Sequence, residues 1–390
     1  MYPTISHLLF DLFGINIPLP IQTFGFWVAI AFLAASYIIS IELKRKEKEG
    51  YLSPTNIKEI IGKRLSVYEI STTLITGFLI GYKLIEAIFN YSDLVINPQD
   101  FILSLRGNLM GGIFIAALSL YLKWNENQKT RLASPKEIDK IVHPFELVGN
   151  MTMIAAVSGI IGAKIFHNLE NIGAFIADPI GQLISFSGLT FYGGLIAGTI
   201  SVIWYTKRYK INTRHLIDAA APGLILAYGI GRIGCQMSGD GDWGINNLEP
   251  KPEWMAFLPD WMWSFSFPHN VINAGVRMQD CGAEFWQPYC YQLANPVWPT
   301  AFYEVVMSLI IFGILWSIRK HIKVPGVLFF IYLVFNGIER FFIEKVRVNT
   351  EYNILGGITQ AEIISFFLVI TGIIGALYLY KYSNTNKKSN

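Results

Sequence analysis

The residues best suited to chemistry lie in one glycine-rich stretch, residues 229–244, which reads Gly-Ile-Gly-Arg-Ile-Gly-Cys-Gln-Met-Ser-Gly-Asp-Gly-Asp-Trp-Gly. It ends an apolar run that begins near Leu216, so Arg232 lies at the tip of a membrane-length segment, and Asp240 and Asp242 follow in the turn. Ionisable groups at membrane depth are costly and usually face a polar cavity, and glycine lets a backbone approach a ligand closely. A cation that only anchors a helix at the headgroups needs no acidic turn beside it. We therefore interpret the stretch as a functional site.

Further polar side chains are expected at the same depth, toward the outer side, from three other apolar segments. They are Tyr192, Tyr303, Glu304, Asn336, Glu339, Arg340, Glu344 and Arg347. Arg340 and Glu344 are four positions apart and share one helical face; taken alone, a structural ion pair explains them equally well. Their convergence with Arg232 favours a site, because two arginines can hold a phosphate through directed, charge-assisted hydrogen bonds. A transporter would usually place its charges near the midplane, so the pattern favours chemistry on an anionic lipid.

The elements that must position these residues are membrane helices. Of the 390 residues, 52% are hydrophobic and 15% are charged, whereas soluble domains carry about 25% charged residues. We predict an all-α polytopic membrane protein with about nine transmembrane helices, each close to the ~20 residues that cross hydrocarbon. The predicted spans are roughly 22–42, 69–90, 108–124, 149–168, 188–206, 216–236, 300–317, 325–345 and 359–381. The net charge of +3 gives no indication of nucleic-acid binding.

Lysine and arginine cluster in alternate loops of this topology. The loops after the first, third, fifth, seventh and ninth spans hold most of the 31 basic residues. Loops rich in Lys and Arg stay on the cytoplasmic side. We therefore expect the N-terminus outside, the C-terminus in the cytoplasm, and the polar site facing the outer leaflet.

The chain forms a single membrane domain, 1–390, with two unusual parts. Residues 69–124 resemble 149–206: both carry an Ile-Gly-x-Lys block, a Ser-x-x-Gly block and a Gly-Gly pair, at an offset of about 81 residues. We interpret 69–124 as an extra, duplicated hairpin; the alternative is a chance likeness of two glycine-rich hairpins.

Residues 245–299 form an insert on the outer side, rich in Trp and Phe, which favour the membrane interface. There Cys281 and Cys290 could pair in an oxidising compartment, or remain free thiols.

Four segments of the chain, 192–197, 231–244, 298–304 and 340–347, carry motifs in the same order as a known family. They resemble the motifs of the prolipoprotein diacylglyceryl transferase family. The family carries His-Gly-Gly-Leu-Ile-Gly, then Gly-Arg-x-Gly-Asn leading through Asn-x-Glu to a Gly, then His-Pro-x-Gln-Leu-Tyr-Glu, and late in the chain Arg-Phe-x-x-Glu-x-x-Arg. The corresponding segments are 192–197, 231–244 with one extra residue, 298–304 and 340–347. The resemblance covers about 15–42 and 149–381, so the extra hairpin and the insert fall outside the usual pattern.

The resemblance implies a bacterial inner-membrane enzyme of lipoprotein biosynthesis. Such enzymes move the diacylglyceryl group of phosphatidylglycerol, a membrane lipid, to the lipobox cysteine of a prolipoprotein, forming a thioether and releasing glycerol phosphate. It implies no cofactor and no metal. The catalytic residues expected from it are Tyr192, Arg232, Asp240, Arg340 and Glu344. The expected substrate-binding residues are Arg232, Gly234, Cys235, Gly244, Tyr303, Glu304, Asn336, Arg340 and Arg347.

The chain departs from the family pattern at the residues that would handle the proton and the headgroup. Tyr192 stands where the family has His, and a phenol with an ordinary pKa of about 10 is a poorer resting base. Asp240, which replaces a Glu, or Glu344 could take the proton instead. Cys235 replaces an Asn that would bind the headgroup. Two other functions therefore stay open at this point: a transporter or flippase for a lipid or anionic solute, and an inactive lipid-binding paralogue.

Overall fold

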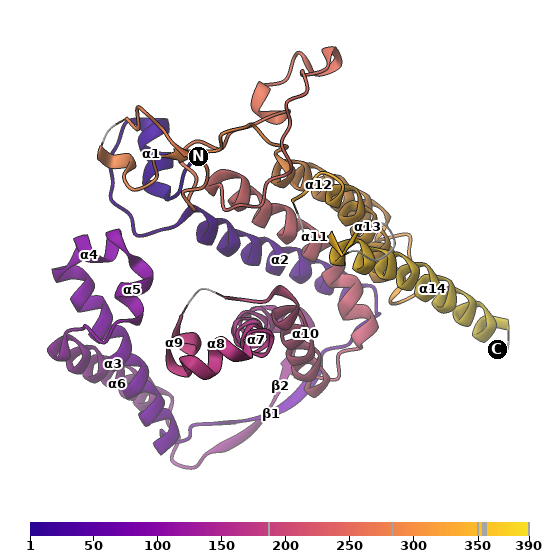
Figure 1. The fold of residues 1–390 in the computed structure, drawn as a ribbon. Helices are drawn as coiled ribbons and strands as arrows, with labels where there is room; N and C mark the ends of the chain where they lie inside the picture. Colours follow the sequence, from indigo (N-terminus) through magenta and orange to yellow (C-terminus); the bar gives the residue numbers. More distant parts are fainter. Residues whose placement is uncertain (186–187, 283, 349–350, 353–356, 389–390) are drawn as a thin grey trace.

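The computed structural model describes residues 1–185, 188–282, 284–348, 351–352 and 357–388. This part of the chain is mostly helical, and each of the nine predicted spans forms a helix (Figure 1). The long helices are α2 (Thr23–Lys48), α3 (Val67–Phe89), α6 (Leu109–Thr130), α7 (Val148–Glu170), α10 (Phe191–Arg208), α11 (Thr213–Ser238), α12 (Thr300–Ile318), α13 (Val327–Glu344) and α14 (Gln360–Lys388). A helix satisfies its own backbone polar groups, as the lipid interior requires.

Six helical stretches of the described chain are long and apolar enough to cross a membrane. They are Thr23–Lys48, Val67–Phe89, Pro144–Glu170, Thr213–Ser238, Thr300–Ile318 and Gln360–Ser383. The first turn of the third is a 3₁₀ helix, Pro144–Leu147, that runs into α7. Helices α6, α10 and α13 are not among the six, and α13 holds three charged residues, Glu339, Arg340 and Glu344. The chain is thus a helical membrane protein with several spans, while the count of nine stays a prediction.

The helices that carry the polar site form one packed layer. Helix α2 packs along α11, α11 packs against α12 and α13, and α14 packs along α13 (Figure 1). Buried apolar residues fill the space among α11, α12 and α13; they are Ile225, Ile311, Leu315 and Leu328. On α11 the Asp218 carboxylate accepts hydrogen bonds from the backbone N–H groups of Gly326 (2.7 Å) and Phe329 (3.0 Å). These bonds satisfy free donors at the start of α13 and so fix that helix against α11.

Two helical hairpins lie outside this layer and share the same order of elements. In one, α3 and α6 are joined by α4 (Tyr91–Ile96) and α5 (Pro98–Leu103); in the other, α7 and α10 are joined by α8 (Ile172–Ala177) and α9 (Pro179–Ile184). The matching lysines make matching contacts, since Lys83 Nζ lies 3.2 Å from Ser104 Oγ and Lys164 Nζ lies 2.8 Å from Ser185 Oγ. The two segments that resemble each other in sequence therefore also resemble each other in structure.

A two-stranded ribbon, which the sequence analysis did not anticipate, carries the first hairpin. Strand β1 (Thr55–Ile61) pairs antiparallel with β2 (Lys136–Val142), and Ile61 lies opposite Lys136. The chain therefore leaves and returns at adjacent positions, and residues 62–135 project from the end of the ribbon (Figure 1). A hydrogen bond from the Tyr91 hydroxyl to the Pro18 carbonyl (2.6 Å) links the hairpin to the N-terminal loop.

The predicted outer insert packs with the N-terminus. It contains three short 3₁₀ helices and the strands β3 (Val276–Arg277) and β4 (Tyr291–Gln292); β5 (Glu351–Tyr352) and β6 (Ile358–Thr359) pair farther along the chain. The Cys281–Cys290 disulfide is present, which confirms the predicted pairing.

Residues 1–21 include a helix, α1 (Ile5–Phe13), that the sequence analysis missed. The amino group of Met1 donates to the Pro268 carbonyl at 2.7 Å. The centroid of the His7 ring lies 4.5 Å from that of Phe285 and 4.7 Å from that of Trp286. Burial lowers the pKa of His7 to about 4. The N-terminal segment thus folds together with the insert.

Candidate active site

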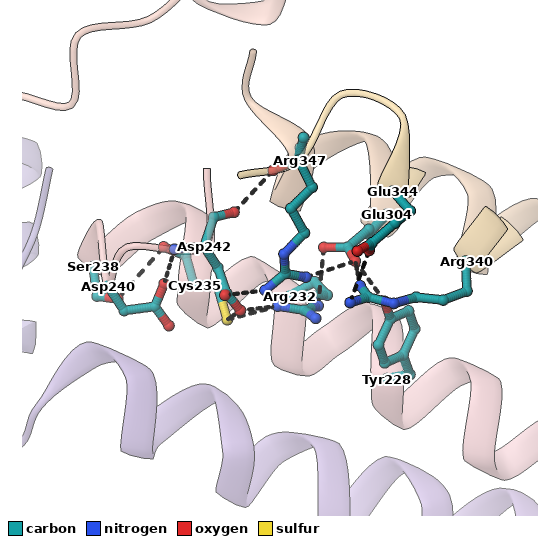
Figure 2. A network of polar contacts seen from close by, with 11 residues as sticks. Tyr228, Arg232, Cys235, Ser238, Asp240, Asp242, Glu304, Arg340, Glu344 and Arg347 are labelled. Carbon is teal, nitrogen blue, oxygen red and sulfur yellow. Dashed lines mark hydrogen bonds and ion pairs between the residues drawn. The ribbon is translucent and has the colours of Figure 1, made fainter. Parts of the chain in front are cut away.

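Three arginines meet where α11 and α13 end and α12 begins. Arg232 lies near the end of α11, Arg340 lies in the last turns of α13, and Arg347 follows that helix (Figure 2). Their side chains are 14%, 25% and 12% exposed, so each guanidinium group is largely removed from bulk water. The structure therefore brings together the cations that the sequence placed at one depth.

Glu304 is the centre of this cluster. Its side chain is fully buried, and it accepts a hydrogen bond from the Tyr228 hydroxyl at 2.7 Å. Its oxygens lie 3.0 Å from Arg232 Nε and 3.3 Å from Arg340 Nη1. A buried carboxylate is tolerated when ion pairs and hydrogen bonds satisfy it. In this structure Glu304 is thus a partner that orients the arginines, and direct contact between Glu304 and substrate stays a prediction.

Arg340 is held by two acids at once. Besides Glu304, its Nη2 lies 3.3 Å from Glu344 Oε2 on the same helix, as the spacing of four predicts. Tyr192 lies in the first turn of α10, and its hydroxyl is within the electrostatic reach of Arg340 and Glu344. It is 39% exposed. Tyr192 therefore borders the cluster from a separate helix.

Asp242 bridges two of the arginines. Its Oδ2 binds Arg232 Nη1 and its Oδ1 binds Arg347 Nη2 (Figure 2). Burial acts to raise the pKa of Asp242, but the guanidinium groups of Arg232 and Arg347 outweigh it and hold that pKa below its ordinary value. Asp242 belongs to the acidic turn that the sequence singles out, but it was not among the predicted site residues.

Gly244 allows Arg347 to reach the site. Gly244 and Arg347 form an isolated antiparallel β-bridge, and a Cβ at Gly244 would lie 2.3 Å from the Val346 carbonyl oxygen. Any larger residue would push the two segments apart, so this glycine positions Arg347. Gly234 has a different place: a Cβ there would lie 3.0 Å from Trp27 Cβ, so it permits close packing of α2 on α11.

Two further predicted substrate-binding residues lie at the edge of the cluster. The Tyr303 hydroxyl donates to the Met262 carbonyl at 2.8 Å, which ties α12 to the outer insert. Asn336 is half-buried on α13, one turn before Arg340 and on the same face. For Gly234, Tyr303 and Asn336, binding of substrate stays a prediction.

Cys235 and Asp240 lie beside the Asp242 bridge. The buried Cys235 Sγ is 3.6 Å from Arg232 Nη1, and the half-buried Asp240 accepts the Asp242 N–H at 3.2 Å. Burial raises the pKa of Asp240 above its ordinary value. Potential ligand atoms of Cys235, Asp240 and Asp242 lie within 4.8 Å of one another. Both Asp242 oxygens already bind guanidinium groups, whose charge repels a cation, so the arrangement suits an anion better than a metal ion.

Two other residues of the cluster were not among the predicted catalytic or substrate-binding residues, although Glu339 was expected at the same depth as the site. Tyr228 precedes Arg232 by one helical turn, and its ring centroid lies 5.2 Å from the Arg232 guanidinium carbon. Glu339 is 3% exposed, and neither carboxylate oxygen has a hydrogen-bond partner among the residues that the structure describes. For Glu339 the available signal was a charged residue within an apolar segment; for Tyr228 it was the spacing of four from Arg232.

The helices that carry the arginine cluster fall within the match to one family. A family model described as prolipoprotein diacylglyceryl transferase matches residues 112–378. The chain is similar to proteins named phosphatidylglycerol–prolipoprotein diacylglyceryl transferase. The one from Clostridioides difficile (strain 630) is 30% identical over 257 residues, 65% of this chain and 87% of the relative. The one from Lactobacillus acidophilus is 28% identical over 297 residues, 74% of this chain and 91% of the relative. With more than half of its length matched, the chain belongs to the prolipoprotein diacylglyceryl transferase family.

Proposed function

We propose that this transferase moves the diacylglyceryl group of phosphatidylglycerol to the thiol of a lipobox cysteine in a prolipoprotein. The proposal extends to this chain what the names of its relatives state. The observation that carries it is the gathering of Arg232, Arg340 and Arg347 in one largely buried cluster. Such a cluster fits a phosphate with acyl chains in the membrane, because guanidinium groups bind phosphate oxygens through directed bonds.

The reaction needs charge stabilisation where the phosphate leaves. The thiolate sulfur forms a bond to the glyceryl carbon, the bond from that carbon to the phosphate oxygen breaks, and glycerol phosphate leaves with the bonding electrons. Cations that are already oriented stabilise this developing charge without rearrangement. Glu304 and Glu344 hold the guanidinium groups of Arg232 and Arg340 in place, which supplies that orientation.

The thiol must also lose its proton, because the thiolate is the nucleophile. Of the three candidates, Glu344 is engaged by Arg340, and Tyr192 is a phenol that is protonated at neutral pH. Asp240 is a half-buried carboxylate next to the bridge, and burial raises its pKa, which makes it a better proton acceptor than an ordinary aspartate. Asp240 takes the proton in the proposed mechanism, and Tyr192 has no part in the proton transfer.

The same proposal places the site at the outer leaflet of the bacterial cytoplasmic membrane, with nine spans and a cytoplasmic C-terminus. Two features support it. The disulfide belongs to the insert that joins the end of α11 to the start of α12, the end at which the arginines lie, and disulfides persist in oxidising compartments. The basic loops at 207–214 and 319–323 lie at the other end, as cytoplasmic loops do.

The insert and the first hairpin have separate places in this proposal. Residues 245–299 cover the site from outside, since Tyr303 and Gly244 both bond to this segment or its flanks. Residues 69–124 are an extra copy of the 149–206 hairpin that does not contribute side chains to the arginine cluster.

A transfer assay tests the proposed function. Purified protein in detergent is incubated with phosphatidylglycerol and a lipobox peptide, and the peptide mass is measured. We expect the mass to rise by one diacylglyceryl group, and a peptide with Ser in place of the lipobox Cys to stay unmodified. An unmodified Cys peptide would instead favour a lipid transporter or an inactive lipid-binding paralogue.

A further inference from the structure

A carboxylate fills the position between two of the clustered arginines. The two oxygens of Asp242 bind Arg232 on α11 and Arg347 beyond α13, so one side chain spans two elements (Figure 2). A phosphodiester presents two non-bridging oxygens that share one negative charge, and a carboxylate presents the same. A phosphate could therefore replace Asp242 with no change in the charge of the site or in the number of arginine contacts.

Among the three acids that pair with the arginines, Asp242 has the freedom to leave. The side chains of Glu304 and Glu344 are 0% exposed, whereas that of Asp242 is 33% exposed. A carboxylate released toward water regains its hydration, while a fully buried one would lose its partners without compensation. The two glutamates are thus fixed supports of the cluster, and Asp242 is an exchangeable occupant.

The backbone around Asp242 allows this exchange without unfolding the turn. Thr300 Oγ1 donates to the Asp242 carbonyl at 2.9 Å, and the next anchor is the backbone bond from Gly244 N–H to the Trp298 carbonyl at 2.8 Å. These bonds hold the main chain on α12. Rotation of the side chain alone would release Arg232 Nη1 and Arg347 Nη2, while Glu304 stays in contact with both guanidinium groups. Asp242 also lies where the chain has one residue more than the family motif.

We propose that Asp242 acts as an internal substitute for the substrate phosphate, and that the anionic lipid enters by displacing it. This proposal rests on the proposed function of the site. It makes Asp242 a specificity-determining residue: an anion must bind the arginines better than the tethered carboxylate does. The arginines also stay paired, and so retain their orientation, when no lipid is bound.

Binding of glycerol phosphate to the purified protein, measured by calorimetry, tests the exchange separately from turnover. Asp242→Asn removes the competing charge with little change of shape, and we expect the dissociation constant to fall by about tenfold. The matched control is Asp260→Asn, a neutralisation of a 92% exposed aspartate on the same outer segment, which should leave the constant unchanged. Asp242→Ser should tighten binding as well, and it provides the comparison if the Asn variant does not fold.

The sign of the effect decides the question. Weaker or unchanged binding in a folded Asp242 variant would overturn the proposal, because it would mean that Asp242 merely orients Arg232 and Arg347. Tighter binding supports the exchange. A protein that binds glycerol phosphate in this way but fails the transfer assay would contradict the proposed function and leave the exchange standing.

Discussion

At the scale of single residues, the site consists of cations whose orientation depends on buried acids. Arg340 uses one nitrogen for Glu304 and another for Glu344, at 3.3 Å each. Neither acid is exposed, so the fork of the guanidinium group is fixed before any substrate arrives. The site therefore supplies a guanidinium group in a fixed orientation, and not only a positive charge.

This dependence predicts that lysine cannot replace Arg340. Arg340→Lys keeps the charge but loses the planar fork, and we expect kcat of lipid transfer to fall by about 10²-fold, the usual effect of losing one charge-stabilising donor. Glu344→Gln should also lower kcat strongly. Arg208→Lys, at the exposed far end of α10, is the control and should keep wild-type turnover. Full activity of Arg340→Lys would show that charge alone suffices.

A second prediction at this scale identifies the proton acceptor. Asp240→Asn should lower kcat by about 10²-fold or more, whereas Tyr192→Phe should cost much less. Asp240 must be ionised to accept a proton, so activity should rise with pH through its pKa, which burial places above the ordinary value. The Asn variant should lack this acidic limb.

Initial rates of both variants from about pH 4 to 10 measure this difference, since the range brackets the ordinary pKa values of Asp and Tyr. Tyr192→His is the companion variant and should keep substantial activity. A large loss in Tyr192→Phe together with normal rates in Asp240→Asn would assign the proton to the phenol instead.

The sequence predicted part of this site and missed part, for identifiable reasons. The Arg340–Glu344 contact follows from a spacing of four on a helix. The Asp242–Arg347 bridge does not, because it depends on the chain after α13 folding back against Gly244. The burial of Glu304 likewise depends on how three helices pack. Contacts within one element could be predicted, whereas contacts between elements required the fold.

Among the elements, the long helices were predicted from the hydrophobic segments, whereas the short helix α1 and the strands were not. Each predicted span corresponds to a long helix. Strands β1 and β2 escaped notice because both are rich in charged residues and their partners are far apart in sequence. Helix α1 was missed because it is shorter than a span and lies before the first one. The helices were predicted from the length of the apolar segments, so this criterion could not detect short helices or strands.

The ribbon predicts that the first hairpin can be removed. Ile61 and Lys136 are paired neighbours, so residues 62–135 can be replaced by an Asn-Gly turn, which suits a two-residue hairpin. We expect the shortened protein to insert into membranes and to keep transfer activity within about threefold, because an insertion with few contacts to the body is dispensable. The assay is lipid transfer per mole of purified protein. Removing 149–206, which carries Tyr192, should abolish activity. Loss of activity in the first deletion alone would assign the extra hairpin a role in catalysis.

At the scale of the whole molecule, the polar chemistry lies at one end of an apolar helical layer. The N-terminus, the outer insert and the arginine cluster share that end, and the C-terminal end of α14 points the other way (Figure 1). The apolar side chains of Leu105 and Met110 on the first hairpin are 94% and 75% exposed, as expected of a surface that faces lipid. This layout lets a lipid keep its acyl chains in the membrane while its headgroup reaches Arg232.

Transfer of the diacylglyceryl group should depend on this arginine cluster. The most direct measurement compares purified wild-type protein with Arg232→Ala, using phosphatidylglycerol labelled in its acyl chains and a lipobox peptide in detergent. We predict labelled peptide from the wild type and at least about a 10²-fold lower rate from the variant, which loses a principal phosphate contact, while both proteins insert and melt alike. A well-folded Arg232→Ala protein with wild-type turnover would contradict the account.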